Sequence, residues 1–453
     1  MKTVFFIGQE KPLLNLKKYG CLEKFLKKDF LVLTTEEIAS KYEFTNEVLI
    51  FKSSWTKKEW VTFQDYLYIK NFITTSRKTL NISLRTRLFG PYKLNSIKRM
   101  VFAFKYFYKF CKRLNFFLIY QKRNYRSTDL LMELRNKNIL SFGDSDKIMS
   151  LLLNQNIEKA IAFTTLNDPI LFDFIEVCKN LGINSIALPD CWDNISTSLA
   201  IPEDISKIYL WSMQQKSEIK TNYPQMLEKS EIYGSYRIKP DASEKLFSEK
   251  NTNDISILYL ESNVFEDRNF VINKIAKCIS ETEYFDSLIQ NVKFIIREYP
   301  GYRPSEPGFD CEVFPFKNFI IGECKFEIIV SKNEFLRDDL AGVNLVFSEL
   351  TTAGLEAAFE KIPTIFIGSN QSPRFITTFR VFHFSFAQDL FNYFPIIKLD
   401  SKSDSQKLTK FLNKFIEGRF RNSLDTNENF NISKKLTFLA EAFDYDKWES
   451  ESI

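Results

Sequence analysis

The sequence predicts an α/β protein made of two units, each with a mostly parallel β-sheet covered by helices. Short apolar runs alternate with helical patterns from the first residues onward, which is typical of parallel strands joined by crossover helices. The alternation starts again at residue 255, after a polar stretch at 239–254 that has the composition of a linker. The length of 453 residues is also too great for one ordinary domain.

The first unit is predicted to span residues 1–238, with strands where short apolar runs end in polar residues. The expected strands are 3–7, 31–33, 47–52, 139–142, 160–163, 185–188, 208–211 and 231–233. Helices are expected between them at 13–28, 146–154, 170–181 and 212–220. The polar residues after the strands, such as Gln9 and Ser53, are expected to line a cleft.

The second unit is predicted to span residues 255–400. Its expected strands are 255–260, 292–296, 326–330, 344–347 and 364–367, and its expected helices are 270–280, 333–340 and 353–361. The tail at 401–453 has apolar residues at helical spacing. We therefore expect two α/β units, a linker and a helical tail.

The stretch most informative about function is 342–369, GVNLVFSELTTAGLEAAFEKIPTIFIGS, which predicts a strand, a turn, a helix and a second strand. Hydroxyl-bearing residues between Ser348 and Thr352 can cap the helix, and Pro363 ends it. The turn would place backbone N–H groups and the positive end of a helix dipole at the carboxyl edge of a sheet, where α/β proteins bind phosphate. A capped unit without a ligand is the alternative.

Composition excludes several classes of protein. Seven cysteines are scattered without a CxxC pair, which favours reduced thiols in a cytosolic protein. The chain has one histidine, so a histidine-rich metal site is excluded. This residue, His383, lies in an apolar run and is expected in the core. We expect no transmembrane helix and no signal peptide, because the apolar runs are too short. The expected location is the cytoplasm.

A basic segment at residues 66–128 interrupts the alternation. It has fifteen basic residues and no Asp or Glu, whereas the rest of the chain has 47 basic and 57 acidic residues. Residues 97–114 predict an aromatic, amphipathic helix, and its basic face comprises Lys98, Lys105, Lys109 and Lys112. Such a helix suits an anionic membrane surface or a polyanionic acceptor. The alternatives are plain packing on the sheet and nucleic-acid binding, although no nucleic-acid-binding signature accompanies the segment.

Three local patterns, at residues 189–237, 294–300 and 348–356, resemble parts of bacterial surface-carbohydrate glycosyltransferases of the GT-B fold. Residues 189–237 resemble the end of the family's N-terminal domain, with a strand-end loop, a strand bearing Trp, a helix and a Gly-Ser turn. Residues 294–300, FIIREYP, resemble the Lys-x-His-Pro element of enzymes that use CMP-activated sugars, such as sialyltransferases and Kdo transferases. Residues 348–356 are similar to the Ser-Ser/Thr element that opens a helix in these enzymes.

The resemblance implies two Rossmann-like domains facing each other across a cleft, with the helices of 401–453 crossing back to the first domain. It implies transfer of a sugar from a nucleotide donor, with CMP-sugar favoured and with no metal or other cofactor. The acceptor would be a surface polysaccharide or a lipid-linked glycan. The enzyme would work in the cytoplasm, peripherally on the inner face of the cytoplasmic membrane.

The donor nucleotide is expected to bind at strand ends of the second unit. The residues expected to hold it are Arg297, Tyr299, Pro300, Ser348, Thr351, Thr352, Gly354, Glu356, Glu261 and Ser262. Tyr299 stands where the family element has histidine, and it can donate a hydrogen bond but cannot act as a cationic acid. Arg297 could supply the positive charge. Glu356 could bind a ribose hydroxyl or favour the helix dipole.

A catalytic acid or base is expected at a strand end of the first unit. Asp190 and Asp193 are the best candidates and Glu10 is the third, while an Asp that only stabilises a local turn is the alternative. Two other functional classes stay open. One is a polymer phosphotransferase or sugar-nucleotide epimerase of similar shape, and the other is a non-catalytic sugar-nucleotide-binding scaffold subunit.

Overall fold

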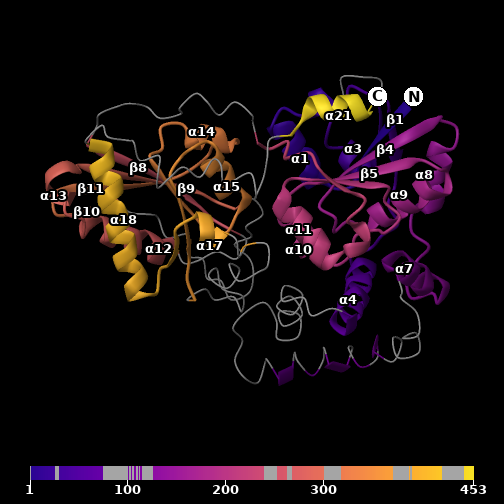
Figure 1. Ribbon diagram of the computed structural model, residues 1–453, viewed down its shortest axis with the longest axis horizontal. Helices are drawn as coiled ribbons and strands as arrows, with labels where there is room; N and C mark the ends of the chain where they lie inside the picture. The colour runs from indigo at the N-terminus through magenta and orange to yellow at the C-terminus, as the bar shows by residue number, and fades with distance from the viewer. Residues whose placement is uncertain are drawn as a thin grey trace. The chain divides into compact units, whose positions relative to one another are not determined.

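The structure is a computed structural model with two compact units (Figure 1). Residues 2–74, 126–238 and 443–452 belong to the first, and residues 253–420 belong to the second. Each unit has a seven-stranded, mostly parallel sheet with helices, so the predicted α/β class with two Rossmann-like units is confirmed. The described residues are 2–25, 30–74, 126–238, 253–262, 268–299, 318–370, 390–420 and 443–452, with isolated positions at 100–114 and 387.

The sheet of the first unit has the order β3-β2-β1-β4-β5-β6-β7, and every neighbouring pair is parallel. Its strands are β1 Lys2–Ile7, β2 Leu31–Thr35, β3 Val48–Phe51, β4 Ile157–Thr164, β5 Asn184–Pro189, β6 Lys207–Leu210 and β7 Ser230–Ile232. The chain runs outward from β1 to β3 and then returns to β4. The strand order therefore reverses between β1 and β4.

Helices cover both faces of this sheet, because its strands are apolar on both sides. Phe6 faces one core layer and its neighbour Phe5 faces the other. The terminal helix packs in the second of these layers, where Trp448 contacts Phe25 with ring centroids 4.8 Å apart. The helices are α1 Glu10–Lys18, α2 Leu22–Phe25, α3 Glu36–Ala39, α4 Lys57–Thr74, α7 Ser127–Asn136, α8 Ser145–Leu152, α9 Pro169–Asn180, α10 Asn194–Thr197, α11 Met213–Asn222, η1 Pro224–Met226 and α21 Tyr445–Ser452.

The sheet of the second unit has the order β10-β11-β9-β8-β12-β13-β14 and is parallel except for the pair β10–β11. Its strands are β8 Asp254–Leu260, β9 Asn291–Arg297, β10 Phe319–Ile321, β11 Cys324–Val330, β12 Leu345–Ser348, β13 Thr364–Gly368 and β14 Ile396–Lys398. Its helices are α12 Arg268–Ser280, α13 Phe285–Leu288, α14 Leu336–Leu340, α15 Thr352–Phe359, α17 Leu390–Tyr393 and α18 Lys402–Phe420. Here the strand order reverses between β8 and β12.

The expectation of a strand at 139–142 is wrong. These residues belong to the turn that follows α7, where Asn138 has a φ of 54° and the Ile139 N–H donates to the Leu134 carbonyl at 2.9 Å. Leu140 packs with the apolar residues of α4 and α7, whereas Phe142 is 63% exposed. The apolar run therefore serves a helix cap and helix packing.

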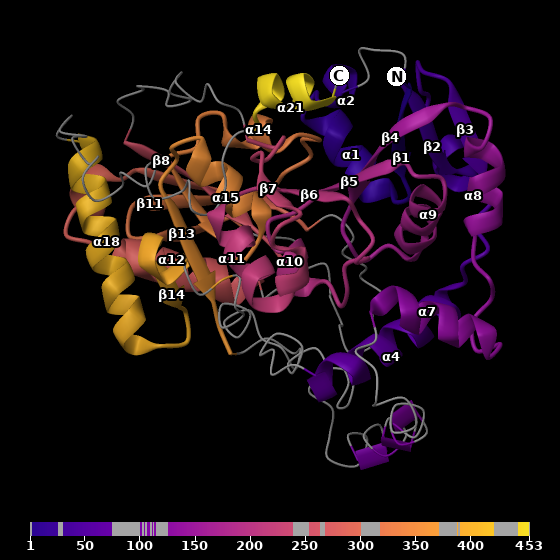
Figure 2. The same cartoon turned by 45° about the vertical axis from the view of Figure 1, so that its right-hand side comes forward.

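Helices α4 and α7 flank residues 75–125 and pack together in the first unit (Figure 2). Phe63 and Leu67 of α4 share an apolar cluster with Leu130 and Leu134 of α7, and Phe172 of α9 joins it. Both helices that border the central part of the basic segment are thus part of the body of the first unit.

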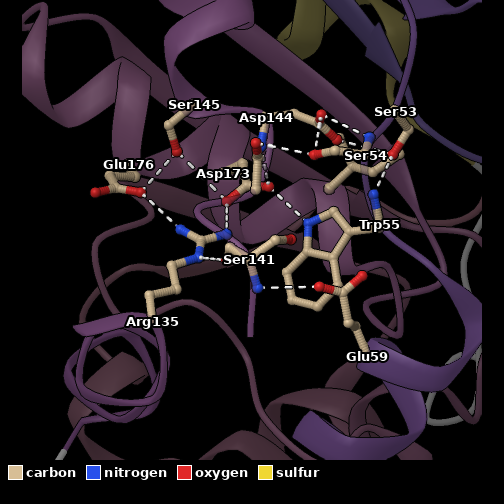
Figure 3. A network of polar contacts seen from close by, with 12 residues as sticks. Ser53, Ser54, Trp55, Glu59, Arg135, Ser141, Asp144, Ser145, Asp173 and Glu176 are labelled. Atoms are coloured by element: carbon tan, nitrogen blue, oxygen red, sulfur yellow. Dashed lines mark hydrogen bonds and ion pairs between the residues drawn. The ribbon is translucent and has the colours of Figure 1, made fainter. Parts of the chain in front are cut away.

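A buried polar network joins α7 to α9 and to the residues that follow β3 (Figure 3). The Asp173 carboxylate of α9 pairs with the Arg135 guanidinium of α7, and both side chains are almost fully buried. The Trp55 indole N–H donates to Asp173 at 2.7 Å, and the Asp144 backbone N–H donates to it at 3.0 Å. Asp144 accepts in turn from the Ser53 hydroxyl at 2.8 Å. Because a buried charge is costly unless it is paired, this network fixes where α7 and the end of β3 meet α9.

Candidate functional site

The point where the second sheet reverses brings together residues that were expected to bind a nucleotide. The neighbouring strands β8 and β12 are parallel and end at the same edge. Open α/β sheets bind ligands outside the carboxyl ends of the strands at such a point. Glu261 and Ser262 follow β8, and Ser348 ends β12, so the structure places these three residues at the reversal.

Helix α15 begins beside this point. The side chain of its N-cap, Thr351, accepts a hydrogen bond from the Gly354 N–H at 3.2 Å and lies 3.3 Å from the Ser348 hydroxyl. Thr351 and Thr352 are half-buried, so the helix start reaches solvent, whereas Ser348 and Glu356 are buried. A helix start with two accessible threonines is suited to a phosphate group.

Gly354 has a packing reason to lack a side chain. A Cβ at this position would lie 2.4 Å from the Ser348 hydroxyl and 2.9 Å from the Phe366 ring. The glycine therefore allows α15 to approach β12 and β13 closely, and this close approach sets where the helix start lies.

The structure adds Glu349, a residue that was not expected at the site from the sequence. Its carboxylate is fully buried and accepts from the Tyr259 hydroxyl at 2.6 Å, the Ser262 N–H at 2.8 Å and the Ser262 hydroxyl at 2.7 Å. The pKa of Glu349 is raised to about 7, because burial, helped by the nearby Glu261 charge, outweighs the hydrogen bonds that lower it. A carboxyl group that titrates near neutral pH at a strand end is typical of functional sites.

Glu261 belongs to a charged cluster at the same edge. Arg268, at the start of α12, has its Nη2 2.8 Å from Glu261 and also 2.7 Å from the Glu298 carboxylate. Burial raises the pKa of Glu261 even though the Arg268 charge lowers it. Tyr299 is half-buried and donates a backbone hydrogen bond to Glu261. Pro300 lies outside the described residues.

Arg297 holds a neighbouring turn. Its guanidinium pairs with Asp339 of α14 and donates to the backbone carbonyls of Asn333 at 3.0 Å and Glu334 at 2.8 Å. Asp339 also accepts from Asn333 at 2.8 Å. A phosphate would therefore have to replace hydrogen bonds that this guanidinium already makes.

The acid or base candidates of the first unit have different environments. Asp190 is fully buried and accepts from Asn15 at 2.8 Å and from the Tyr236 hydroxyl at 2.6 Å. Asn15 also donates to the second carboxylate oxygen at 3.0 Å, so both oxygens of Asp190 accept hydrogen bonds. Asp193 is half-buried at the start of α10. The Tyr42 hydroxyl donates to Glu10 at 2.8 Å, and this hydrogen bond lowers the pKa of Glu10.

Asp168 is a further buried carboxyl that the sequence analysis did not select. It caps α9 through a hydrogen bond from the Ile170 N–H at 3.0 Å, while its Oδ2 makes no hydrogen bond. This oxygen lies against Gly8 at the end of β1, since a Cβ there would be 2.3 Å from it. Burial raises the pKa of Asp168 to about 7. The Asp-Pro pair before an apolar helix predicts the cap, but only the fold shows the unpaired oxygen.

The described part of the basic segment exposes apolar side chains. Met100, Val101, Phe104, Phe107 and Tyr108 are helical and 59–76% exposed. The four lysines that were expected on the basic face, Lys98, Lys105, Lys109 and Lys112, lie outside the described residues.

Metal-binding clusters and membrane-spanning helices are both absent from the described residues. Across the described residues, His, Cys, Asp and Glu do not gather in groups of three that could hold a metal ion. Every helix in the described ranges is too short or too polar to cross a lipid bilayer.

No protein-family model matches the chain, and no curated protein matches it in sequence. Among solved structures, it is similar to UGT89C1 of Arabidopsis thaliana, with 13% identity, a TM-score of 0.49 and coverage of 100% of this chain and 98% of that one. It is similar to the spinosyn rhamnosyltransferase SpnG, with 8% identity, a TM-score of 0.42 and full coverage of both chains. It is similar to the calicheamicin glycosyltransferase CalG4, with 9% identity, a TM-score of 0.40 and coverage of 95% and 98%. Similarities of this size assign no activity to the chain.

Proposed function

We propose that the chain is a GT-B glycosyltransferase that binds a nucleotide sugar at the reversal point of its second sheet. The observation that carries the proposal is the start of α15 beside β8 and β12, with Thr351 and Thr352 accessible and Ser348 beneath them. Parallel α/β sheets bind phosphorylated ligands at such points. Of the residues expected to bind the donor, those that the structure describes belong to the ends of β8, β9 and β12 or to the first turns of α15.

The proposed chemistry needs stabilisation of the leaving phosphate and a base for the acceptor hydroxyl. The N–H groups and threonine hydroxyls of the helix start would hold the phosphate, and no protein-bound metal is required for this. Arg268 would add positive charge at the same edge, and Arg297 would act by holding the 333–339 turn. For the base we propose Asp193 or Glu10, because Asp190 is buried in its own hydrogen bonds.

The resemblance of residues 294–300 to the CMP-sugar element makes a CMP-sugar the favoured donor. The proposed acceptor is a surface polysaccharide or a lipid-linked glycan precursor. Incubation of the purified chain with CMP-, UDP-, GDP- and dTDP-sugars should release one nucleotide in the presence of such an acceptor. Release of nucleoside monophosphate from a CMP-sugar would support the favoured donor.

A negative charge introduced at the start of α15 tests the proposed nucleotide site. Thr352→Glu should weaken nucleotide-sugar binding at least about tenfold, since the new carboxylate repels the phosphate. The same carboxylate favours the helix dipole, so α15 should not be destabilised. Isothermal titration calorimetry measures the affinity, and Thr352→Gln is the control with the same size and no charge. Equal affinities for the Glu and Gln variants would contradict this site.

We also propose that the basic segment binds an anionic membrane surface, where a lipid-linked acceptor would be found. The exposed apolar side chains at 100–108 lie in a segment with fifteen basic and no acidic residues. Apolar residues can enter the lipid interface while basic residues contact anionic headgroups. Arg113, which follows these side chains in the sequence, pairs with Asp65 of α4 in the first unit.

Replacing both Phe104 and Phe107 with Asn should reduce binding to vesicles of phosphatidylcholine and phosphatidylglycerol at least about tenfold, because two buried aromatic side chains are lost from the lipid interface. Both residues are exposed, so folding should not change. Co-sedimentation measures binding, and Phe142→Asn, at a 63% exposed position outside the segment, is the control. Unchanged sedimentation of the double variant would contradict membrane contact.

Two other functions predict different results in these experiments. A scaffold subunit would bind a nucleotide sugar and release no nucleotide. A polymer phosphotransferase or an epimerase would yield a phosphodiester or an isomerised donor in place of a glycoside. Product analysis by mass spectrometry and nuclear magnetic resonance separates these outcomes.

A further inference from the structure

We infer that Gln215 of α11 is a positioning residue for Asp193, and that Asp193, not Glu10, is the base for the acceptor hydroxyl. The inference rests on the proposed glycosyl transfer, because a base is needed only if a hydroxyl attacks the donor sugar. Gln215 would not touch a substrate. It would act by holding the loop that carries Asp193 in one conformation.

The loop after β5 is buried except at one side chain. From 185 to 196 every residue is buried apart from Asp193, which is half-buried. Asp193 is the N-cap of α10, but its carboxylate makes no cap hydrogen bond to this helix. The loop therefore presents one accessible carboxylate at the carboxyl edge of the first sheet, the edge at which open α/β sheets bind their ligands.

Gln215 holds the tip of this loop. Its amide nitrogen donates to the carbonyls of Cys191 and Trp192, both at 3.1 Å. Its amide oxygen accepts from the Trp211 backbone N–H at 2.7 Å. Gln215 is fully buried, and a buried amide is costly unless it is hydrogen-bonded. Both ends of the amide are thus used to join the loop after β5 to the end of β6.

The start of the loop is held by other contacts. The Asp190 carboxylate accepts from Asn15 of α1 at 2.8 Å and from the Tyr236 hydroxyl at 2.6 Å. These donors belong to α1 and to the chain after β7, so their contacts do not depend on Gln215. A change of the Gln215 side chain should therefore loosen residues 191–193 while the end of β5 stays in place.

Glu10 is less suited to act as the base. Its carboxylate accepts from the Tyr42 hydroxyl at 2.8 Å and lies 3.4 Å from the Lys41 ammonium group. The Tyr42 hydrogen bond lowers the pKa of Glu10, and a weaker base takes a proton from a hydroxyl less readily. Both contacts would also have to give way to an acceptor.

The kinetic effect of Gln215 should appear in kcat. Gln215→Met keeps the length of the side chain but removes its three hydrogen bonds. Because a displacement of about 1 Å can cost about 100-fold in rate, this change should lower kcat about 10- to 100-fold. The KM for the donor should stay the same, since the proposed donor site lies in the second unit.

The neighbouring Gln214 provides the matched control. It is also buried, but its amide nitrogen donates within α11, to Glu218 at 2.6 Å. Gln214→Met should therefore lower the stability of the first unit to a similar extent, measured by urea denaturation, and leave kcat unchanged. A merely structural role of Gln215 would give the two variants the same kinetics.

Nucleotide release from CMP-, UDP-, GDP- and dTDP-sugars in the presence of the proposed acceptors measures kcat and KM. Asp193→Asn should lower kcat at least about 100-fold, and more than Glu10→Gln does. In the Asp193→Asn background, Gln215→Met should cause no further loss, because Gln215 acts only through Asp193. A further loss there, or a larger effect of Glu10→Gln than of Asp193→Asn, would overturn the inference and leave the proposed function standing.

Amide hydrogen exchange of the full-length chain without ligand measures the loop itself. The Cys191 N–H donates to the Asn194 side chain at 2.7 Å, and the Asn194 N–H donates to the Cys191 carbonyl at 3.1 Å. Both should exchange at least about tenfold faster in Gln215→Met than in Gln214→Met. Equal exchange in these two variants would also overturn the inference.

Gln215→Glu keeps the test decisive if Gln215→Met does not fold. At pH 6 its buried carboxyl should be protonated, so it can accept from Trp211 and donate to one loop carbonyl. Its kcat should lie between those of Gln214→Met and Asp193→Asn, and a kcat equal to that of Gln214→Met would contradict the positioning role. A wild-type chain that releases no nucleotide from any donor would overturn the proposed function, while hydrogen exchange would still show whether Gln215 holds the loop.

Discussion

Replacing Arg135 with methionine is expected to lower the free energy of unfolding of the first unit by about 3–5 kcal/mol. The substitution keeps much of the volume of the side chain but leaves Asp173 buried without its cation. The Trp55 and Asp144 hydrogen bonds to Asp173 cannot replace the lost charge. All five tryptophans of the chain lie in the first unit, so urea denaturation followed by tryptophan fluorescence reports on this unit.

The matched control is Arg126→Met. Arg126 also forms ion pairs, with Asp129 and Asp204, but its side chain is 46% exposed. Surface ion pairs contribute little, so this change should cost less than about 1 kcal/mol. Similar losses for the two variants would show that the Arg135–Asp173 pair does not hold α7 to α9.

Replacing Asp168 with asparagine should change the pH dependence of stability. Since burial raises the pKa of Asp168 to about 7 in the folded state, its carboxyl stays protonated there while it ionises in the unfolded chain. The wild-type protein should therefore lose stability as the pH rises from about 4 to 7, by up to about 4 kcal/mol. The asparagine side chain does not titrate, so the variant should gain stability over the wild type by this amount between pH 4 and pH 8.

Asp129→Asn is the control for this pH series. Although partial burial raises it, the Arg126 guanidinium keeps the pKa of Asp129 below its ordinary value. The stability that Asp129 contributes is therefore lost as the pH falls, whereas that of Asp168 is lost as the pH rises. Because Asp129 is exposed, its contribution should stay below about 1 kcal/mol. A stability gap between wild type and Asp168→Asn that does not vary with pH would contradict the burial of a protonated carboxyl.

The strands of the two sheets could be predicted well where they are buried on both faces, as in the run that forms β8. Strands β10 and β14 were not predicted. Each has only three residues, whereas the equally short β7 was predicted with the Gly-Ser turn that follows it. The prediction of a strand at 139–142 was wrong because this run, too, is short. A four-residue run with three apolar residues cannot distinguish a buried strand from a helix cap, and here the cap is favoured by packing against α4 and α7.

The site shows what local patterns can and cannot predict. The hydroxyl-rich turn and helix at 348–359 could be predicted because capping is local in sequence. The role of Glu349 could not, because its partner Ser262 is 87 positions away in the chain. Arg297 was expected to bind the donor nucleotide, but in the structure it pairs with the carboxylate of Asp339, 42 positions later in the chain. Only the fold reveals which long-range partner a charged side chain finds.

The most direct test of the central claim is amide hydrogen exchange of the full-length chain with and without a saturating nucleotide sugar. We expect slower exchange in peptides that cover 259–262 and 348–356, at the β8 and β12 ends. Thr352→Glu should lose this protection while Thr352→Gln keeps it. Protection confined to strand ends of the first unit, such as 8–10 or 164–168, would contradict a donor site at the start of α15.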